Sequence, residues 1–172
     1  MTGKPEQCPY FPPYVIRDQT LFQMIAAFVE ATQKADDLLR QESFLIEIVS
    51  RCLTHYAQDP VTFRTFGIHH QTVKRVREYL EQHIADTVKL AELAAVAHLS
   101  PFHLNRTFQQ EVGMPPYEYL VQIRIKHAQT LLKQGESIAS TAYSTGFADQ
   151  SHFTRFFKRH VGITPGEYLQ SH

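Results

Sequence analysis

Cysteine is scarce in this sequence, with only Cys8 and Cys52 among 172 residues. Two widely separated cysteines cannot form a disulfide framework, and their spacing fits no zinc site. Long apolar runs are also missing, since none approaches the roughly 18 residues that a membrane span needs. The first residues, MTGKPEQCPYFPPY, show neither the basic nor the apolar region of a signal peptide. We therefore expect a reduced, cytoplasmic protein with no membrane partner.

A net charge of either sign is missing too, because 17 Lys and Arg balance 17 Asp and Glu. That neutrality argues weakly against nucleic-acid binding, which usually leaves a basic footprint. The balance is uneven along the chain, however, since residues 1–70 carry a net charge of −2 and residues 71–172 carry +2. The segment RFFKRH places Arg155, Lys158 and Arg159 close together. A hydrophobic content of 43% predicts a globular protein.

The usual signatures of catalysis and cofactor binding are absent from the sequence. It has no glycine-rich phosphate loop, and no nucleophile is spaced to pair with a base. The ten histidines are scattered, and the His69–His70 pair has no companion carboxylates in sequence. We therefore predict no enzyme activity, no cofactor and no metal site.

The first third of the chain has its own organisation. Four of the nine prolines lie within residues 5–20 and predict an extended arm. Apolar residues at i, i+3, i+4 and i+7 then predict amphipathic helices over residues 20–34 and 36–57. The segment DPVTFRTFGIHH, residues 59–70, has no helical period and predicts a linker. Residues 1–58 are therefore expected to form an arm followed by a short helical hairpin.

From residue 71 onward helical signals are dense and strand-like alternation is missing, so we predict an all-α fold. Ser100 followed by Pro101 is a strong helix start, because the hydroxyl caps free amides and proline has no N–H to satisfy. Gly113 is expected to end that helix. Thr87 is a candidate N-cap for the helix before it. A longer helix is predicted over about residues 115–134.

One segment of the sequence is written twice. With an offset of 49 residues, the matches include Arg106 with Arg155, Phe108 with Phe157, Gly113 with Gly162, Pro116 with Pro165, and Tyr119 with Tyr168. Each copy contains a short Ala-rich helix, a turn, and a helix with basic and amide side chains. This is the outline of a helix-turn-helix, whose second helix enters a DNA major groove. We place the two units at about residues 88–113 and 137–162, joined by the helix at 115–134.

The two second helices each combine an apolar face with a face suited to DNA. Leu104 and Phe108 in the first, and Phe153 and Phe157 in the second, are predicted to face the core. The residues left on or near the opposite faces are Asn105, Arg106, Gln109, Gln150, Ser151, His152 and Arg155. Arginine can donate two hydrogen bonds to guanine, and Asn or Gln can pair with adenine. Lys158 and Arg159 are placed to reach phosphates.

The stretch SIASTAYSTGFADQSHFTRFFKRHVGITPGEYL is specific enough to suggest a family. With LAELAAVAHLSPFHLNRTFQQEVGMPPYEYL before it, residues 71–172 resemble the DNA-binding domain of AraC/XylS-type transcriptional regulators. The resemblance implies two helix-turn-helix subdomains joined by a linker helix, which bind promoter DNA as an activator or a repressor. RNA polymerase is then a candidate partner. The implied base-facing positions are Phe102, Asn105 and Arg106 with Gln109 adjacent, and Gln150, Ser151 and Arg155 with His152 adjacent.

Residues 1–58 depart from the pattern of that family, in which a β-barrel effector domain often precedes dimerising helices. A barrel of that kind does not fit before Thr20, so we expect this sequence to represent only the helices that follow the barrel, as a fragment of a longer protein or as a naturally shortened member. We expect these N-terminal helices either to pack on each other or to mediate a homodimer.

Two other functions compete with DNA-binding regulation. The chain could be a helical interaction or dimerisation module without DNA binding, which its neutral charge favours slightly. It could also be a relative of methyl-acceptor DNA-repair proteins, but these need four cysteines at one site.

Overall fold

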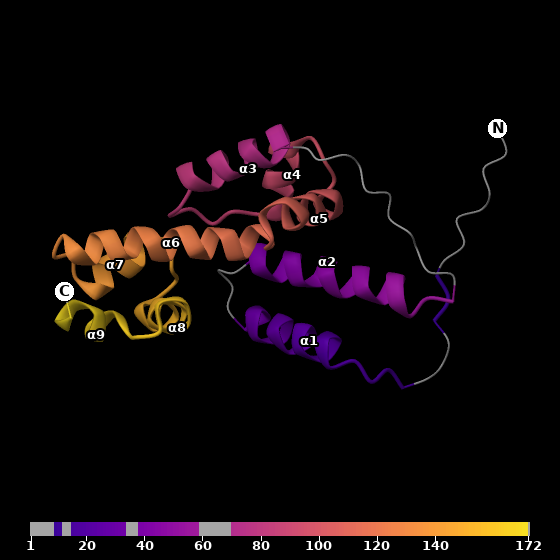
Figure 1. The fold of residues 1–172 in the computed structure, drawn as a ribbon, viewed down its shortest axis with the longest axis horizontal. Helices are drawn as coiled ribbons and strands as arrows, with labels where there is room; N and C mark the ends of the chain where they lie inside the picture. Colours follow the sequence, from indigo (N-terminus) through magenta and orange to yellow (C-terminus); the bar gives the residue numbers. More distant parts are fainter. Residues whose placement is uncertain (1–8, 12–14, 34–37, 59–69, 172) are drawn as a thin grey trace.

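The computed structural model describes residues 9–11, 15–33, 38–58 and 70–171. Within these ranges the chain contains helices and turns and no strand, which confirms the predicted all-α fold (Figure 1). The helices in order are α1 (Gln19–Thr32), α2 (Leu38–His55), α3 (His70–Gln82), α4 (Leu90–Ala97), α5 (Pro101–Val112), α6 (Pro116–Lys133), α7 (Ile138–Ser144), α8 (Gln150–Val161) and α9 (Pro165–Gln170). No helix in the described ranges has both the length and the apolar character of a membrane span. Most of the predicted arm and linker lies outside the described residues.

The repeated sequence folds into two equivalent helices, α5 and α8, because both copies carry the same start and stop signals. Ser100 accepts a hydrogen bond from the His103 amide at 3.3 Å, and Asp149 accepts one from the His152 amide at 2.6 Å. Both helices end at glycines in the left-handed region, Gly113 at φ 84° and Gly162 at φ 92°. The predicted roles of Ser100, Pro101 and Gly113 are thereby confirmed.

The predicted N-cap at Thr87 is wrong. Helix α4 begins at Leu90, and the capping position belongs to Lys89. The amide of Leu90 donates to Oε2 of Glu42 on α2 at 2.7 Å. A carboxylate from a distant helix therefore satisfies a free amide that a local hydroxyl was expected to satisfy, and it also suits the positive end of the helix dipole.

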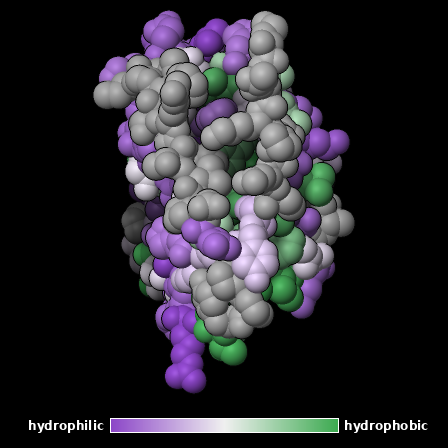
Figure 2. Space-filling view, turned by 90° about the vertical axis from the view of Figure 1, so that its right-hand side faces the viewer, coloured by the Kyte–Doolittle hydropathy of each residue, from purple (hydrophilic) through white to green (hydrophobic). Residues whose placement is uncertain are grey.

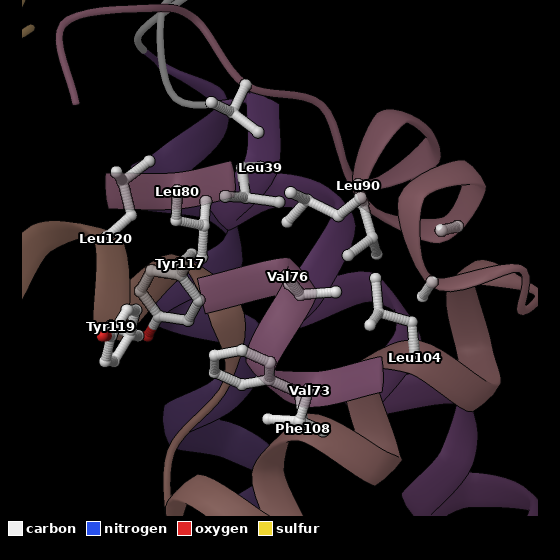
Figure 3. Close-up of a cluster of buried hydrophobic side chains, with 14 of the residues drawn as sticks. Leu39, Val73, Val76, Leu80, Leu90, Leu104, Phe108, Tyr117, Tyr119 and Leu120 are labelled. Atoms are coloured by element: carbon white, nitrogen blue, oxygen red, sulfur yellow. The ribbon is translucent and has the colours of Figure 1, made fainter. Parts of the chain in front are cut away.

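Two hydrophobic cores lie at the two ends of α6. The first is formed by α2 to α5 with the start of α6, and Figure 3 shows Leu39, Val76, Leu80, Leu104, Phe108 and Tyr117 converging there. The second is formed by α6 to α9 and includes Ile125, Leu132, Phe147, Phe153, Phe157 and Tyr168. Since α6 contributes to both cores, it is the rigid connection between the two units (Figure 1).

Arg124 on α6 fastens the turn of the second unit to the first unit. Its Nε donates to the Ile84 carbonyl at 2.7 Å, its Nη2 donates to the Asp86 carbonyl at 2.8 Å, and its guanidinium lies over the Phe147 ring. Gly146 lies against the same group with φ +73°, and a Cβ there would meet Nη2 of Arg124 at 2.7 Å. Only glycine suits this approach. We call Arg124 and Gly146 the inter-unit brace.

Helices α1 and α2 form an N-terminal hairpin that packs against the rest of the molecule. Asp18 caps α1 by accepting from the amides of Thr20 and Leu21, and it also accepts from Arg51 Nε of α2 and from the hydroxyl of Tyr56 just after α2, both at 2.6 Å. The bonds from Arg51 and Tyr56 hold the pKa of Asp18 well below its ordinary range. Leu39 and Phe44 of α2 join the first core, where the Phe44 ring lies 5.1 Å from that of Tyr117.

Candidate nucleic-acid interface

Helix α5 buries the apolar residues that its sequence predicts and leaves a polar row on its outer side. Leu104 and Phe108 are fully buried. Phe102, Arg106 and Gln109, at i, i+4 and i+7, follow one face, on which Gln109 is exposed and the other two are half-buried. This face is the candidate reading face of the first unit.

Asn105 does not share that face, so its predicted outward position is wrong. Only 2% of the residue is exposed. On a helix, position 105 lies about 60° from the core position of Phe108, because three residues turn the chain by about 300°. Helix α2 covers this side, where the Asn105 amide interacts with the carboxylate of Glu47. The sequence carries no local signal for this contact, since it depends on a helix some 60 residues away.

Helix α8 presents a longer and more open row of polar side chains. Gln150, Ser151, Thr154, Arg155, Lys158 and Arg159 line one shallow hollow on its surface. Five of these are residues that the sequence predicts as contacts to bases or phosphates, so the structure brings them together. Thr154 is the residue of this hollow that was not predicted from the sequence. Its position at i+4 from Gln150 could have identified it.

His152 is the one predicted residue of α8 that points elsewhere. It is 7% exposed, and its ring meets Phe156 edge-on at 4.8 Å and Phe147 edge-on at 5.7 Å. The prediction that His152 faces outward is therefore wrong, because the aromatic residue of the turn and the one at i+4 enclose it. The side chain at the matching position, His103, is half-buried and lies 3.0 Å from Ser100 Oγ.

The N-terminal hairpin borders both reading faces. On α8, Arg155 Nη1 donates to Glu30 Oε1 of α1 at 2.5 Å. Beside α5, a hollow of about 710 Å³ has Phe102, Arg106 and Gln109 on one wall and residues of α1 and α2 on the other, including Met24, Glu47, Ser50 and Thr54. The hairpin thus lies next to the residues that a DNA duplex would have to approach.

Glu47 lines this hollow and has a strongly shifted pKa. Its pKa is raised from the ordinary 4.5 to about 7, first because of burial and second because of the nearby Glu118 carboxylate, while a hydrogen bond from the Asn105 amide lowers it in part. Its Oε1 and the Asn105 Oδ1 are both buried, and neither has a hydrogen-bond donor among the described residues. A proton on Glu47 would supply a donor where two acceptors lack one.

Histidine and metal chemistry give no competing site in the described part of the chain. No group of three His, Cys, Asp or Glu residues there is arranged to hold a metal ion. His70 does have a carboxylate partner, contrary to the prediction from sequence: its Nδ1 lies 2.5 Å from Glu111 Oε1 on α5. His69 lies outside the described residues.

Comparisons with known proteins agree with this geometry. Residues 93–171 match a family model described as a helix-turn-helix domain. The HTH-type transcriptional regulator YbfI of Bacillus subtilis is 36% identical over 145 residues, which are 84% of this chain and 52% of YbfI. AdaA of the same species, named as a bifunctional transcriptional activator and DNA repair enzyme, is 31% identical over 57% of this chain and 47% of its own. The chain thus spans about half the length of these relatives.

Solved structures also match this chain. A probable AraC family transcriptional regulator from Rhodopseudomonas palustris aligns with a TM-score of 0.55 at 29% identity, over 59% of this chain and 96% of its own. The DNA-binding domain of AdpA, solved in complex with a target DNA, aligns with a TM-score of 0.55 at 26% identity, over 58% of this chain and 91% of its own.

Proposed function

Because residues 93–171 belong to the AraC-type helix-turn-helix family, we propose that the chain regulates transcription by placing α5 and α8 in successive major-groove segments of promoter DNA. The proposal divides the chain into residues 1–58, a linker at 59–70 and a DNA-binding domain at 71–172. Its place of action is the cytoplasm, with RNA polymerase as a further candidate partner.

One observation carries the proposal. Arg106 and Arg155 occupy matching positions on two helices that are capped, ended and packed in the same way. Each arginine has amide or hydroxyl side chains beside it on an outward face. A repeated fold needs matching core residues for packing alone, but packing does not require a repeated outward arginine.

The outward residues fall into two groups, those assigned to base edges and those assigned to phosphates. We assign base reading to Arg106 and Gln109 on α5 and to Gln150, Ser151 and Arg155 on α8, with Phe102 available for contact to a thymine methyl group. Lys158 and Arg159 lie in the last turn of α8 and are assigned to phosphates. Asn105 and His152 are not assigned to bases in this conformation.

A binding-site selection with the full chain tests the proposal. We expect two enriched half-sites about 10 base pairs apart, because two recognition helices on one side of a duplex meet the major groove once per turn. We also expect the logarithm of the binding constant to fall linearly with the logarithm of salt concentration. No enrichment, together with no binding at low salt, refutes DNA-binding regulation.

Exposed apolar residues on the hairpin favour a second function, association between copies of the chain. Figure 2 shows hydrophobic side chains at the surface of this end of the molecule, among polar ones. The large exposed apolar residues of the hairpin are Phe22, Ile25 and Val29 on α1 and Leu45 and Val49 on α2, each 43–66% exposed. Sedimentation equilibrium tests the homodimer, and a monomer at every concentration rules it out. A dimer without DNA binding would favour the interaction module.

A non-enzymatic role completes the proposal. Both relatives carry regulator names, which supports it, and AdaA alone adds a repair function. Only Cys52 is a free cysteine among the described residues, whereas a zinc and cysteine methyl-acceptor site needs four cysteines.

A further inference from the structure

The N-terminal hairpin occupies the space beside both reading faces at once. Helix α2 packs against α4, α5 and α6, and α1 packs against α2 on the side toward α8 (Figure 1). The hairpin therefore lies between the outer side of α5 and the outer side of α8. A single duplex that reached both helices would pass through this region.

On the α8 side, the hairpin engages the arginine assigned to base reading. Glu30 of α1 accepts from Arg155 through Oε1 at 2.5 Å, while its Oε2 lies 3.6 Å from Arg40 of α2. Arg40 is 3% exposed, and its guanidinium lies over the Phe156 ring of α8. Glu30 thus joins α1, α2 and α8, and it uses an N–H group of Arg155 that guanine would need.

On the α5 side, the hairpin covers part of the helix and narrows access to the rest. Helix α2 buries Asn105. The base edges of the major groove lie about 8.5 Å below its rim, so a recognition helix must insert deeply to read them. A hollow of about 710 Å³ between α5 and the hairpin cannot accept a duplex. The exposed carboxylate of Glu30 would also come near the DNA phosphates, and the two like charges repel each other.

Solved domains of this fold are complete without such a hairpin. The matching solved structures align over 58% and 59% of this chain, a share too small to include the hairpin together with both helix-turn-helix units. The aligned part makes up 91% and 96% of those two chains, so chains of this fold exist that contain little beyond the aligned domain. The hairpin is accordingly an addition to a complete DNA-binding fold.

We propose that the N-terminal hairpin is an autoinhibitory lid, closed in this structure, that competes with DNA for Arg155 and for the outer side of α5. This inference rests on the proposed DNA binding and adds its regulation. With the lid closed, the apparent affinity for an operator equals the affinity of the open form multiplied by the open fraction. Any change that loosens the hairpin without touching the reading residues should therefore tighten DNA binding.

Two glutamine variants with opposite expected effects test the lid in the full chain. Glu30→Gln removes the charge that pairs with Arg155 and should tighten binding by about two- to fivefold, the range of an exposed ion pair. Glu47→Gln removes a buried carboxylate and supplies a donor toward Asn105, so it should hold the lid closed and weaken binding at pH 8. Both variants lose one negative charge, and simple electrostatics predicts that both bind DNA more tightly.

The matched control is Glu78→Gln, which makes the same charge change on an exposed face of α3, where Glu78 pairs with Lys74 of its own helix. The probe is a fluorescein-labelled duplex from the binding-site selection, followed by anisotropy. Equal affinities for Glu30→Gln and Glu78→Gln, with DNA binding intact, overturn the lid and leave the proposed function standing. If no variant binds any duplex, both proposals fail.

Hydrogen exchange provides a second readout that does not depend on the variants. With saturating duplex, amides of α1 (Gln19–Thr32) in the wild-type chain should exchange faster than in the free protein, because the lid has been displaced. Exchange in α1 that is unchanged or slower on the DNA complex overturns the lid, since the hairpin would then stay in place or contact the DNA itself.

Discussion

Glu47→Gln should change how the stability of the protein depends on pH. Burial and the nearby Glu118 carboxylate outweigh the Asn105 amide and raise the pKa of Glu47 in the folded protein to about 7, against an ordinary value of 4.5. The folded state therefore binds this proton more tightly than the unfolded state does. Its stabilising effect is complete below about pH 4.5 and is lost as the pH rises through 7. The glutamine variant cannot ionise and should keep its stability over this range.

The size of the effect follows from the shift. At 1.36 kcal/mol per pH unit, the change from 4.5 to about 7 corresponds to roughly 3 kcal/mol. Glu47 is half-buried rather than enclosed, so solvent screening reduces this, and we expect about 1–2 kcal/mol. Arg51, His55 and Arg106 line the same hollow and are present in both proteins, so the two proteins differ there only in the carboxyl group of Glu47.

The assay is urea unfolding followed by circular dichroism at pH 5, 6, 7 and 8, for the wild type, Glu47→Gln and the exposed control Glu78→Gln. The free energy of unfolding of Glu47→Gln, taken relative to the wild type, should increase from pH 5 to pH 8. The same difference for Glu78→Gln should not change with pH. A difference between Glu47→Gln and the wild type that does not vary with pH would refute the assigned environment of Glu47.

Three further predictions concern the DNA-binding domain. Arg155→Ala should cost about 1–3 kcal/mol at a single base position in a binding-site selection, and an unchanged sequence preference would remove Arg155 from base reading. Lys158→Ala should weaken binding evenly across sequences and reduce the salt slope by about one, so a change confined to one base would reassign it. Gly146→Ala should lower the thermal midpoint, because the new Cβ meets Arg124 at a backbone angle that favours glycine. Gly113→Ala, with φ 84° but open space around it, is the matched control for the collision.

The sequence predicts well whatever depends on local spacing. The core positions Leu104, Phe108, Phe153 and Phe157 follow from an i, i+4 pattern that the first and second units share. The starts and ends of α5 and α8 follow from capping chemistry within four residues of each end. These features need no knowledge of where the rest of the chain lies.

The errors at Asn105 and Thr87 arise because a distant segment of the chain makes the deciding contact. Asn105 has the right residue type and falls near the right face, but α2 covers it. Thr87 is a plausible cap, but Glu42 of α2 supplies the group that the helix uses, one turn further on. His152 is enclosed by Phe147, whose position depends on the turn between α7 and α8. For Asn105 and Thr87 the deciding partner comes from a distant helix whose placement local periodicity does not encode, whereas His152 is also enclosed by Phe156, four residues along its own helix.

The inter-unit brace limits which spacings between two half-sites of an operator the chain can bind. Because Arg124 and Gly146 fasten the second unit to the loop before α4, the two recognition helices are joined by a stiff spacer rather than a tether. Once one helix is bound, a stiff spacer presents the other at a high effective concentration, but only where the geometry fits. Inserting one base pair between the half-sites rotates the second by about a tenth of a turn. The gain from bivalence should then be lost abruptly, so that the distance between half-sites is recognised as strictly as the bases within them.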